Sequence, residues 1–325
     1  MRFALVLALF APVFAQDDET LTLKFKYAPG EREIMEMSLD LRMDVGVYAG
    51  AETFEQKMEG PMGFSLGVAC KTSGEGRFGF EGEMGGLEMT QDMVVNGTKM
   101  KMTVKGKNVR IENADGEALI DTEKGVNAEA ADEILKEFAL FGQKFDITMD
   151  DRGLVKGLSE NKKLREFLGG MAGENLYPVV LPDKPVKIGE EWTYVAKMKE
   201  LGKLKLSGEG MDVPIKYRLE HVETAGDGAR VAVITVRQET NLKDLELEGN
   251  LEGLPAGAKI SIKSMTVSGK GETRFLIGTG RIQTGEFEGK AKAEMKIKVD
   301  GMEEMEGVVD AKIKAKVAPK KEKTK

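Results

Sequence analysis

Long stretches of this sequence place an apolar side chain at every second position, and this alternation is the strongest constraint on its fold. From residue 33 onward the even positions are mostly polar or charged, whereas the odd positions carry Met35, Met37, Leu39, Leu41, Met43 and Val45. A period of two sends successive side chains to opposite faces of a strand. The segment is therefore predicted to be a β-strand with one buried face.

The same pattern recurs through most of the chain. It continues at even positions between 54 and 70, and it returns in the last hairpin, where 287–299 and 309–317 alternate apolar residues with charged ones. Asn96-Gly97 lies between two such runs and is a strong hairpin signal, and Gly85-Gly86 is typical of a bulge. We therefore predict a mainly β fold (α+β) built from long, curved antiparallel sheets.

Two segments depart from the period of two. Asn127 is predicted to cap a helix over 128–141, whose apolar face comprises Ala131, Ile134, Leu135, Phe138 and Phe141. A shorter helix is predicted over 159–169. We expect one or both helices to pack on the concave face of the sheet.

The chain divides into segments of different composition. Residues 1–15 have the charged start, apolar run and small-residue end of a secretory signal peptide, and we find no later apolar stretch long enough to cross a membrane. We expect a β-rich half at 16–173, a proline-rich connector at 174–186, a second β-rich half at 187–318 and a disordered basic tail at 319–325. These features predict an exported, soluble protein in the periplasm or outside the cell.

Three short segments of the first half have counterparts, in the same order, in the second. Residues 30–34 match 189–193, residues 71–78 match 223–231, and Gly153-Leu154-Val155 matches Gly280-Arg281-Ile282. The pattern favours an internal duplication. Chance recurrence of glycine-rich turns in a β protein is the alternative.

The connector carries the most specific sequence motif. Residues 181–192 read Leu-Pro-Asp-Lys-Pro-Val-Lys-Ile-Gly-Glu-Glu-Trp. This segment resembles one found in a family of uncharacterised exported bacterial proteins, in which Leu-Pro-x-Lys-Pro-Val-x-x-Gly-x-x-Trp joins two β-rich halves. The resemblance implies a similar architecture and no activity. In outline this architecture is also similar to periplasmic lipoprotein carriers.

The composition excludes several chemistries. The chain has one His and one Cys, so we expect no metal cluster, no redox pair, no catalytic triad and no cofactor. We interpret His221 as a partly exposed strand residue and Cys70 as a buried free thiol. A net charge of −7 gives no general signal for nucleic-acid binding. We therefore expect a protein that is not an enzyme; the alternative is an enzyme that works with carboxylates.

The methionines suggest a candidate binding face. Ten of the 19 lie between residues 35 and 102, many on the predicted inward faces of strands. Because methionine is flexible and polarizable, a surface rich in it can adapt to apolar partners. We predict an apolar face that binds a small molecule or lipid and contains Met35, Met37, Met58, Met62, Phe64, Met84, Met100 and Met102. The alternative is a structural or protein–protein interaction module of the cell envelope, with an envelope protein as partner, in which these residues only fill the core.

Overall fold

The computed structural model describes residues 19–50, 52–158, 177–198, 200–201, 204–207, 210–248, 259–299 and 304–320. Within them the chain is nearly all antiparallel strand with one short helix, which confirms the predicted mainly β fold. The predicted signal peptide at 1–15 and the predicted helix at 159–169 lie outside the described residues.

The elements alternate long strands with tight turns. The first half contains β1 (Thr20–Leu21), β2 (Arg32–Ala49), β3 (Glu52–Gly74), β4 (Arg77–Val95), β5 (Thr98–Lys105), β6 (Asn108–Asn113), β7 (Ala118–Asp121), α1 (Ala128–Glu137), β8 (Lys144–Asp150) and β9 (Val155–Leu158). The second half contains β10 (Val186–Lys187), β11 (Glu191–Met198), β12 (Glu200–Leu201), β13 (Leu204–Leu206), β14 (Met211–Thr224), β15 (Arg230–Glu248), β16 (Lys259–Leu276), β17 (Arg281–Lys298) and β18 (Met305–Pro319).

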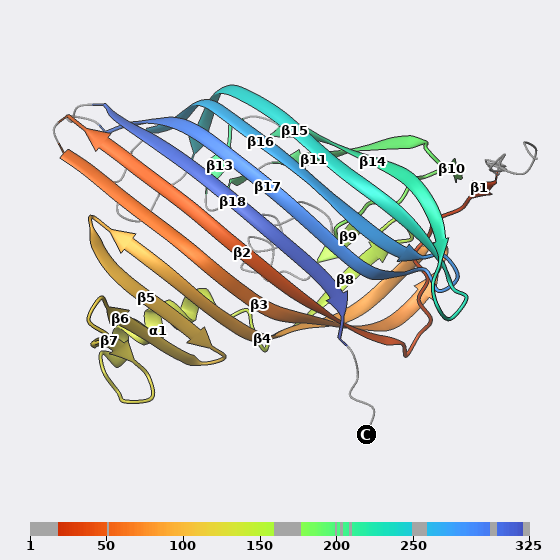
Figure 1. Cartoon of the computed structure of the whole chain (residues 1–325), viewed down its shortest axis with the longest axis horizontal. Coiled ribbons are helices and arrows are strands. Elements are labelled where there is room, and N and C mark those ends of the chain that lie inside the picture. The colour runs from red at the N-terminus through yellow and green to blue at the C-terminus, as the bar shows by residue number, and fades with distance from the viewer. Residues whose placement is uncertain are drawn as a thin grey trace, which may run out of the picture.

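The two halves form one continuous sheet rather than two. It has 16 strands among the described residues, and twelve of them follow the order β11-β14-β15-β16-β17-β18-β2-β3-β4-β5-β6-β7 (Figure 1). Off this path, β8 pairs with β4 and β9, and β13 pairs with β12 and β15. The halves meet where β18 pairs antiparallel with β2, from Glu306 opposite Tyr48 to Pro319 opposite Met35. Pro319 is thus the last residue of a strand and not the start of a disordered tail, because its pairing with β2 holds it there, whereas residues 321–325 lie outside the described part.

The turns and the bulge follow the sequence prediction. Asn96 and Gly97 have φ angles of 48° and 81°, the left-handed conformation that a tight hairpin of two residues requires. Gly86 has φ 64° and lies where the register between β3 and β4 shifts, which confirms the predicted bulge.

The helix is shorter than predicted. It ends at Glu137 because residues 138–143 form single turns, in which the Phe141 amide donates to the Phe138 carbonyl. The predicted side-chain cap is also wrong: Asn127 adopts a left-handed conformation and its side chain makes no capping hydrogen bond. Ala131 is fully buried against strands β4 to β7, as predicted. No helix among the described residues is long and apolar enough to cross a membrane.

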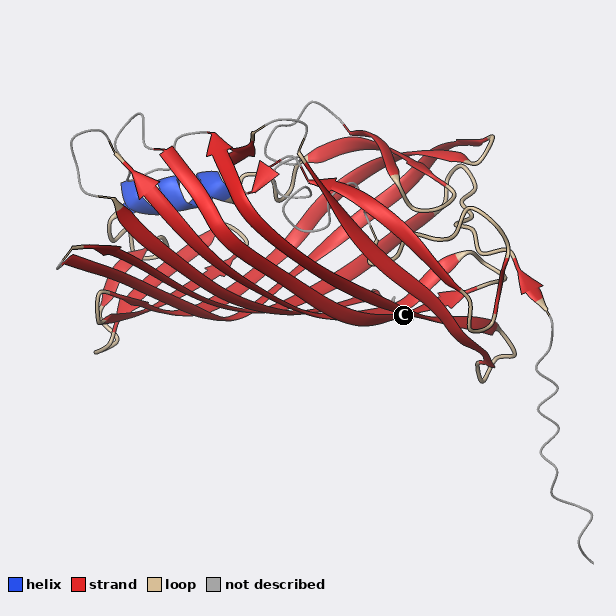
Figure 2. Cartoon of the chain, turned by 90° about the horizontal axis from the view of Figure 1, so that it is seen from above, coloured by secondary structure: helices blue, strands red, loops and turns tan. Residues whose placement is uncertain are grey.

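One face of the sheet, here called the inner face, carries the core. It includes Met35, Phe64 and Leu219, and the sheet curves with α1 on this side (Figure 2). At one end, two segments without long strands cover it: residues 19–31 and the connector, where Val179, Val180 and Leu181 are almost completely buried. The described part of the connector, residues 177–186, is therefore part of the core, because the three apolar residues between Pro178 and Pro182 are buried against the inner face.

One of the three matched pairs, 30–34 with 189–193, has the same local structure in both halves, whereas the turns within 71–78 and 223–231 differ in length. The Gly30 amide donates to the Cys70 carbonyl and the Cys70 amide to the Glu31 carbonyl; Gly189, Leu219 and Glu190 repeat this exchange. In both copies the glutamate side chain also accepts from a backbone amide three residues earlier. These shared contacts support the predicted internal duplication.

A polar cluster at the edge of the core, with two buried tyrosines, connects the two halves of the chain. The Tyr27 hydroxyl lies 2.5 Å from the Tyr177 hydroxyl and donates to Glu33 Oε2 at 2.7 Å. The Arg281 guanidinium lies 3.4 Å from the centre of the Tyr27 ring and pairs with Glu31 at 2.7 Å. Burial is the main cause that raises the pKa of both tyrosines above the ordinary value.

This cluster predicts that the protein loses stability in alkali. The folded protein retains the Tyr27 and Tyr177 protons above about pH 10, where the unfolded chain releases them, so each pH unit above that value removes up to about 1.4 kcal/mol per tyrosine. Urea unfolding at about pH 8 and about pH 11 measures the loss. The double variant Tyr27→Phe/Tyr177→Phe should show a smaller loss, whereas Tyr48→Phe, whose side chain is exposed, should behave as wild type. An equal loss in all three proteins contradicts the prediction.

Candidate functional site

The eight residues predicted for the apolar face fall into two groups. Met35, Phe64 and Met84 are only 1%, 4% and 1% exposed, in the core beneath residues 19–31 and the connector. The other five are partly buried on the same face: Met37, Met58, Met62, Met100 and Met102. The first group is covered by the protein itself, so only the second group offers surface to a ligand.

The strand register places four methionines side by side. Met43 of β2 lies opposite Met58 of β3, Met58 opposite Met93 of β4, and Met93 opposite Met100 of β5. All four are partly buried on the inner face. We call them the methionine row. Met43 and Met93 were counted among the clustered methionines, but sequence alone gave no register, which only the strand pairing supplies.

Small residues continue the row into the second half. Ala311 of β18 lies opposite Met43, Ala291 of β17 opposite Ala311, and Val267 of β16 opposite Ala291. These three are also partly buried. Beside them, Gly269 and Gly289 occupy neighbouring inner positions. The Phe287 ring lies against both glycines. The middle of the inner face is therefore an apolar floor of small residues and Phe287 over β16 to β18, with flexible thioethers over β2 to β5.

One buried polar group lies beside the methionine row. Gln91, two residues before Met93 on β4, is 2% exposed. Its Nε2 donates to the Gly60 carbonyl at 3.0 Å, where Pro61 lacks the amide that would continue the ladder. Its Oε1 has no hydrogen-bond partner among the described residues. A polar residue at an inward position of an apolar pattern was the sequence signal for this group.

An unpaired acceptor of this kind is costly in a folded protein. Leaving a buried polar atom without a partner costs about 1–3 kcal/mol. Thr240 of β15 lies opposite Val267, at the other end of the row that begins with the methionines. Its Oγ1 is likewise buried and has no partner among the described residues. The inner face thus has apolar surface with two unpaired polar atoms buried beneath it, and a mostly apolar surface with a few polar groups is typical of ligand sites.

The other candidate residues offer no reactive arrangement. Cys70 is buried and free, as predicted; burial raises the pKa of its thiol, and its Sγ donates to the Thr72 carbonyl at 3.4 Å. His221 is exposed on β14, as predicted, with Nε2 3.9 Å from Glu223. Among the described residues no group of three or more His, Cys, Asp or Glu is placed to hold a metal ion.

Comparisons with known proteins assign no family. No protein-family profile matches the sequence, and no curated protein matches it. Among solved structures, lipovitellin, from a study of its lipid–protein interactions, aligns with a TM-score of 0.39 and 8% identity over 91% of this chain, which spans only 26% of lipovitellin. An outer membrane channel from Pseudomonas putida F1 aligns with a TM-score of 0.20 and 7% identity, over 90% of this chain and 97% of the channel. The β domain of the Bordetella autotransporter Brka aligns with a TM-score of 0.21 and 9% identity, over 88% of this chain and 98% of that domain. Similarity at this level assigns neither an activity nor a ligand.

The division of the methionines predicts two sizes of mutational effect. Met35→Ala or Met84→Ala removes a completely buried side chain and should lower the free energy of unfolding by about 2–5 kcal/mol. Met58→Ala or Met100→Ala removes a partly exposed one and should cost about 1 kcal/mol or less. Urea unfolding measures all four variants. Equal costs in the two groups would show that the methionine row packs as tightly as the core.

Proposed function

We propose that this protein is a non-catalytic binding protein that holds an apolar ligand, such as a lipid, on the inner face of its sheet. The observation that carries the proposal is the methionine row, which remains partly exposed in the middle of a curved sheet whose end is filled by residues 19–31 and the connector. Thioethers adapt their shape to apolar partners at low cost, so such a floor suits chains of varied length and branching.

The polar atoms of the inner face narrow the class of ligand. Gln91 Oε1 is an acceptor without a donor, but it is buried, so a ligand reaches it only when the flexible side chains of the methionine row move aside. A ligand with a hydroxyl, amide or protonated acid group would then satisfy it, whereas a pure hydrocarbon would not. We therefore expect an amphipathic ligand with an apolar body and one hydrogen-bond donor. Among the described residues no cation is buried on the inner face, which argues against a ligand that depends on a single ionised carboxylate.

A second function is favoured by a different observation. Met35, Phe64 and Met84, three of the predicted binding residues, are completely covered by the chain itself. If the same were true of the methionine row when the whole protein is folded, the sheet would be a structural or protein–protein interaction module with a self-filled core. The two functions differ in whether an apolar molecule accompanies the purified protein.

Ligand analysis of the purified protein tests the proposal. Native mass spectrometry, followed by organic extraction and mass spectrometry of the extract, should reveal a bound amphipathic lipid. The double variant Met58→Asp/Met93→Asp places two carboxylates on the apolar floor, where transfer from water is costly. Its affinity for a fluorescent fatty alcohol should fall more than about tenfold.

The matched control changes the other face of the same region. Lys57→Gln/Lys101→Gln alters the charge of the chain by the same amount at exposed positions of β3 and β5. These changes should leave the affinity for the alcohol unchanged, and circular dichroism should show folded sheet in both variants. Absence of any extracted lipid, together with equal probe binding by all three proteins, would support the self-filled module.

A further inference from the structure

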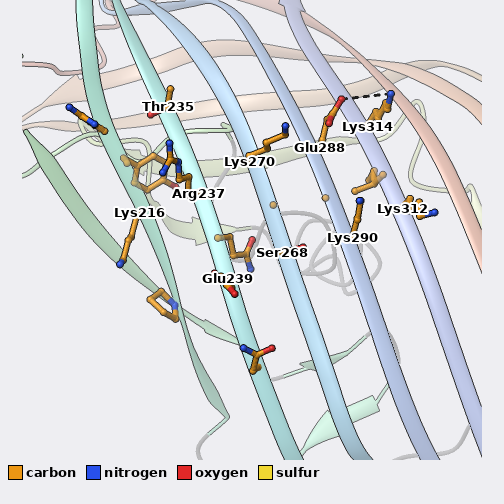
Figure 3. Close-up of a pocket in the computed structure, with 18 of the residues that line it drawn as sticks. Lys216, Thr235, Arg237, Glu239, Ser268, Lys270, Glu288, Lys290, Lys312 and Lys314 are labelled. Atoms are coloured by element: carbon orange, nitrogen blue, oxygen red, sulfur yellow. Dashed lines mark ion pairs between the residues drawn. The ribbon is translucent and has the colours of Figure 1, made fainter. Parts of the chain in front are cut away.

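A second surface lies on the outer face of the sheet, in its second half. It is a trough of 1020 Å³ that crosses β14, β15, β16, β17 and β18 (Figure 3). Seven of its lining residues are cationic and three are acidic; the cations are Lys216, Arg218, Arg237, Lys270, Lys290, Lys312 and Lys314. We call it the basic trough. The chain as a whole has a net charge of −7, so this cluster does not follow from a general excess of cations.

The basic trough brings like charges directly opposite one another. Arg237 lies between Lys216 and Lys270 in the register of β14, β15 and β16. Lys312 likewise lies between Lys290 and Arg42 in the register of β17, β18 and β2. Adjacent strands are only about 4.8 Å apart, and like charges in directly opposed positions destabilise a sheet.

Most of these cations also lack a partner. Within the described part of the chain, Lys216, Arg237, Lys270, Lys290 and Lys312 take part in no ion pair or side-chain hydrogen bond, whereas Lys314 lies 3.7 Å from Glu288. Elsewhere on the same face, three lysines form ion pairs. The distances are 3.2 Å for Lys292–Asp310, 2.8 Å for Lys316–Glu286 and 2.9 Å for Lys263–Glu306. The five unpaired cations of the trough differ from these three lysines in having no carboxylate of the described residues within ion-pair distance.

The surroundings of the cations indicate the kind of anion that fits. The Ser268 hydroxyl lines the trough beside the lysines, whereas the Thr235 hydroxyl donates to Glu220 Oε1 at 2.7 Å. The ammonium and guanidinium groups and the Ser268 hydroxyl are donors that suit phosphate oxygens. The lining includes one aromatic residue, Tyr217, which is only 2% exposed and belongs to the core on the other face. Bases of a single-stranded nucleic acid would find no ring on which to stack. A hollow across five strands also fits a narrow chain better than a flat membrane surface.

We propose that the basic trough binds a linear polyphosphate-type polyanion, which lies across strands β14 to β18. Its phosphates neutralise the opposed cations and release bound counterions, so binding weakens as salt concentration rises. This inference is independent of the ligand proposed for the inner face, because the methionine row lies on β2 to β5 and the trough lies on the other face of β14 to β18.

Calorimetric titration of the full-length protein with long-chain inorganic polyphosphate tests the proposal. The triple variant Lys270→Gln/Lys290→Gln/Lys312→Gln should lose at least about tenfold in affinity at constant salt. The control Lys57→Gln/Lys99→Gln/Lys101→Gln removes the same charge from exposed positions of β3 and β5 and should lose less than about twofold. Equal losses in the two variants would overturn the site.

A second variant separates a binding role from a structural one. Arg237→Glu places a carboxylate between Lys216 and Lys270, so it should raise the midpoint of thermal unfolding while weakening polyphosphate binding. A residue that served only the fold would lower the midpoint when changed. A lower midpoint in Arg237→Glu therefore contradicts the proposal.

Competing anions complete the test. Vesicles of phosphatidylglycerol and a single-stranded oligodeoxynucleotide of equal total charge should each bind more weakly than polyphosphate. Tighter binding of the vesicles, lost in the triple variant, would show that the surface meets a membrane and would overturn the proposed ligand. Tighter binding of the oligonucleotide would also overturn the proposed ligand, because it would show that the surface binds nucleic acid.

Discussion

The pairing of β18 with β2 is the interaction on which the rest of this structure depends. Without it, the first and last long strands of the described sheet would each present a row of unpaired amides and carbonyls, which favours aggregation. With it, the two halves share one sheet, and Ala311 comes to lie beside Met43. The apolar floor from β16 to β5 therefore exists only because the two halves pair.

A sheet of this length must cover its inner face, and the chain does so unevenly. At one end residues 19–31 and the connector bury aromatic and aliphatic side chains, with Phe25 stacked 4.7 Å from Tyr177. Near β5 to β7 the helix covers the sheet through Ala131. Between these two covers, the methionine row is only partly buried. The fold itself thus places the candidate site in the middle of the inner face.

Much of the fold could be predicted from alternation and turn residues. The alternation from Met35 onward gives β2, and Asn96-Gly97 gives the turn between β4 and β5, because both signals act within a few residues. The connector was harder to predict. Proline indicates an extended chain, but local sequence does not reveal that Val179 to Leu181 would be buried by strands distant in the sequence.

The candidate site could be predicted only in part for the same reason. A methionine-rich inward face was visible in the sequence, but the pattern gives the face of each residue and not its neighbour on the next strand. The strand register places Met58 opposite Met43 and Met93. Segments that are distant in the sequence cover Met84, so its side chain is not available to a ligand. The basic trough was not predicted, because its opposed lysines come from strands that the sequence alone could not align.

Both surfaces depart from what stability alone would favour. At partly exposed strand positions, valine or isoleucine would fit a pleated sheet better than the flexible side chains of Met58 and Met93. In the trough, acidic residues opposite Arg237 and Lys290 would stabilise the sheet, as Asp310 does for Lys292 just outside it. Because a period of two gives each face its own set of residues, neither departure forces the other. Local conflicts of this kind are expected where a protein meets a partner.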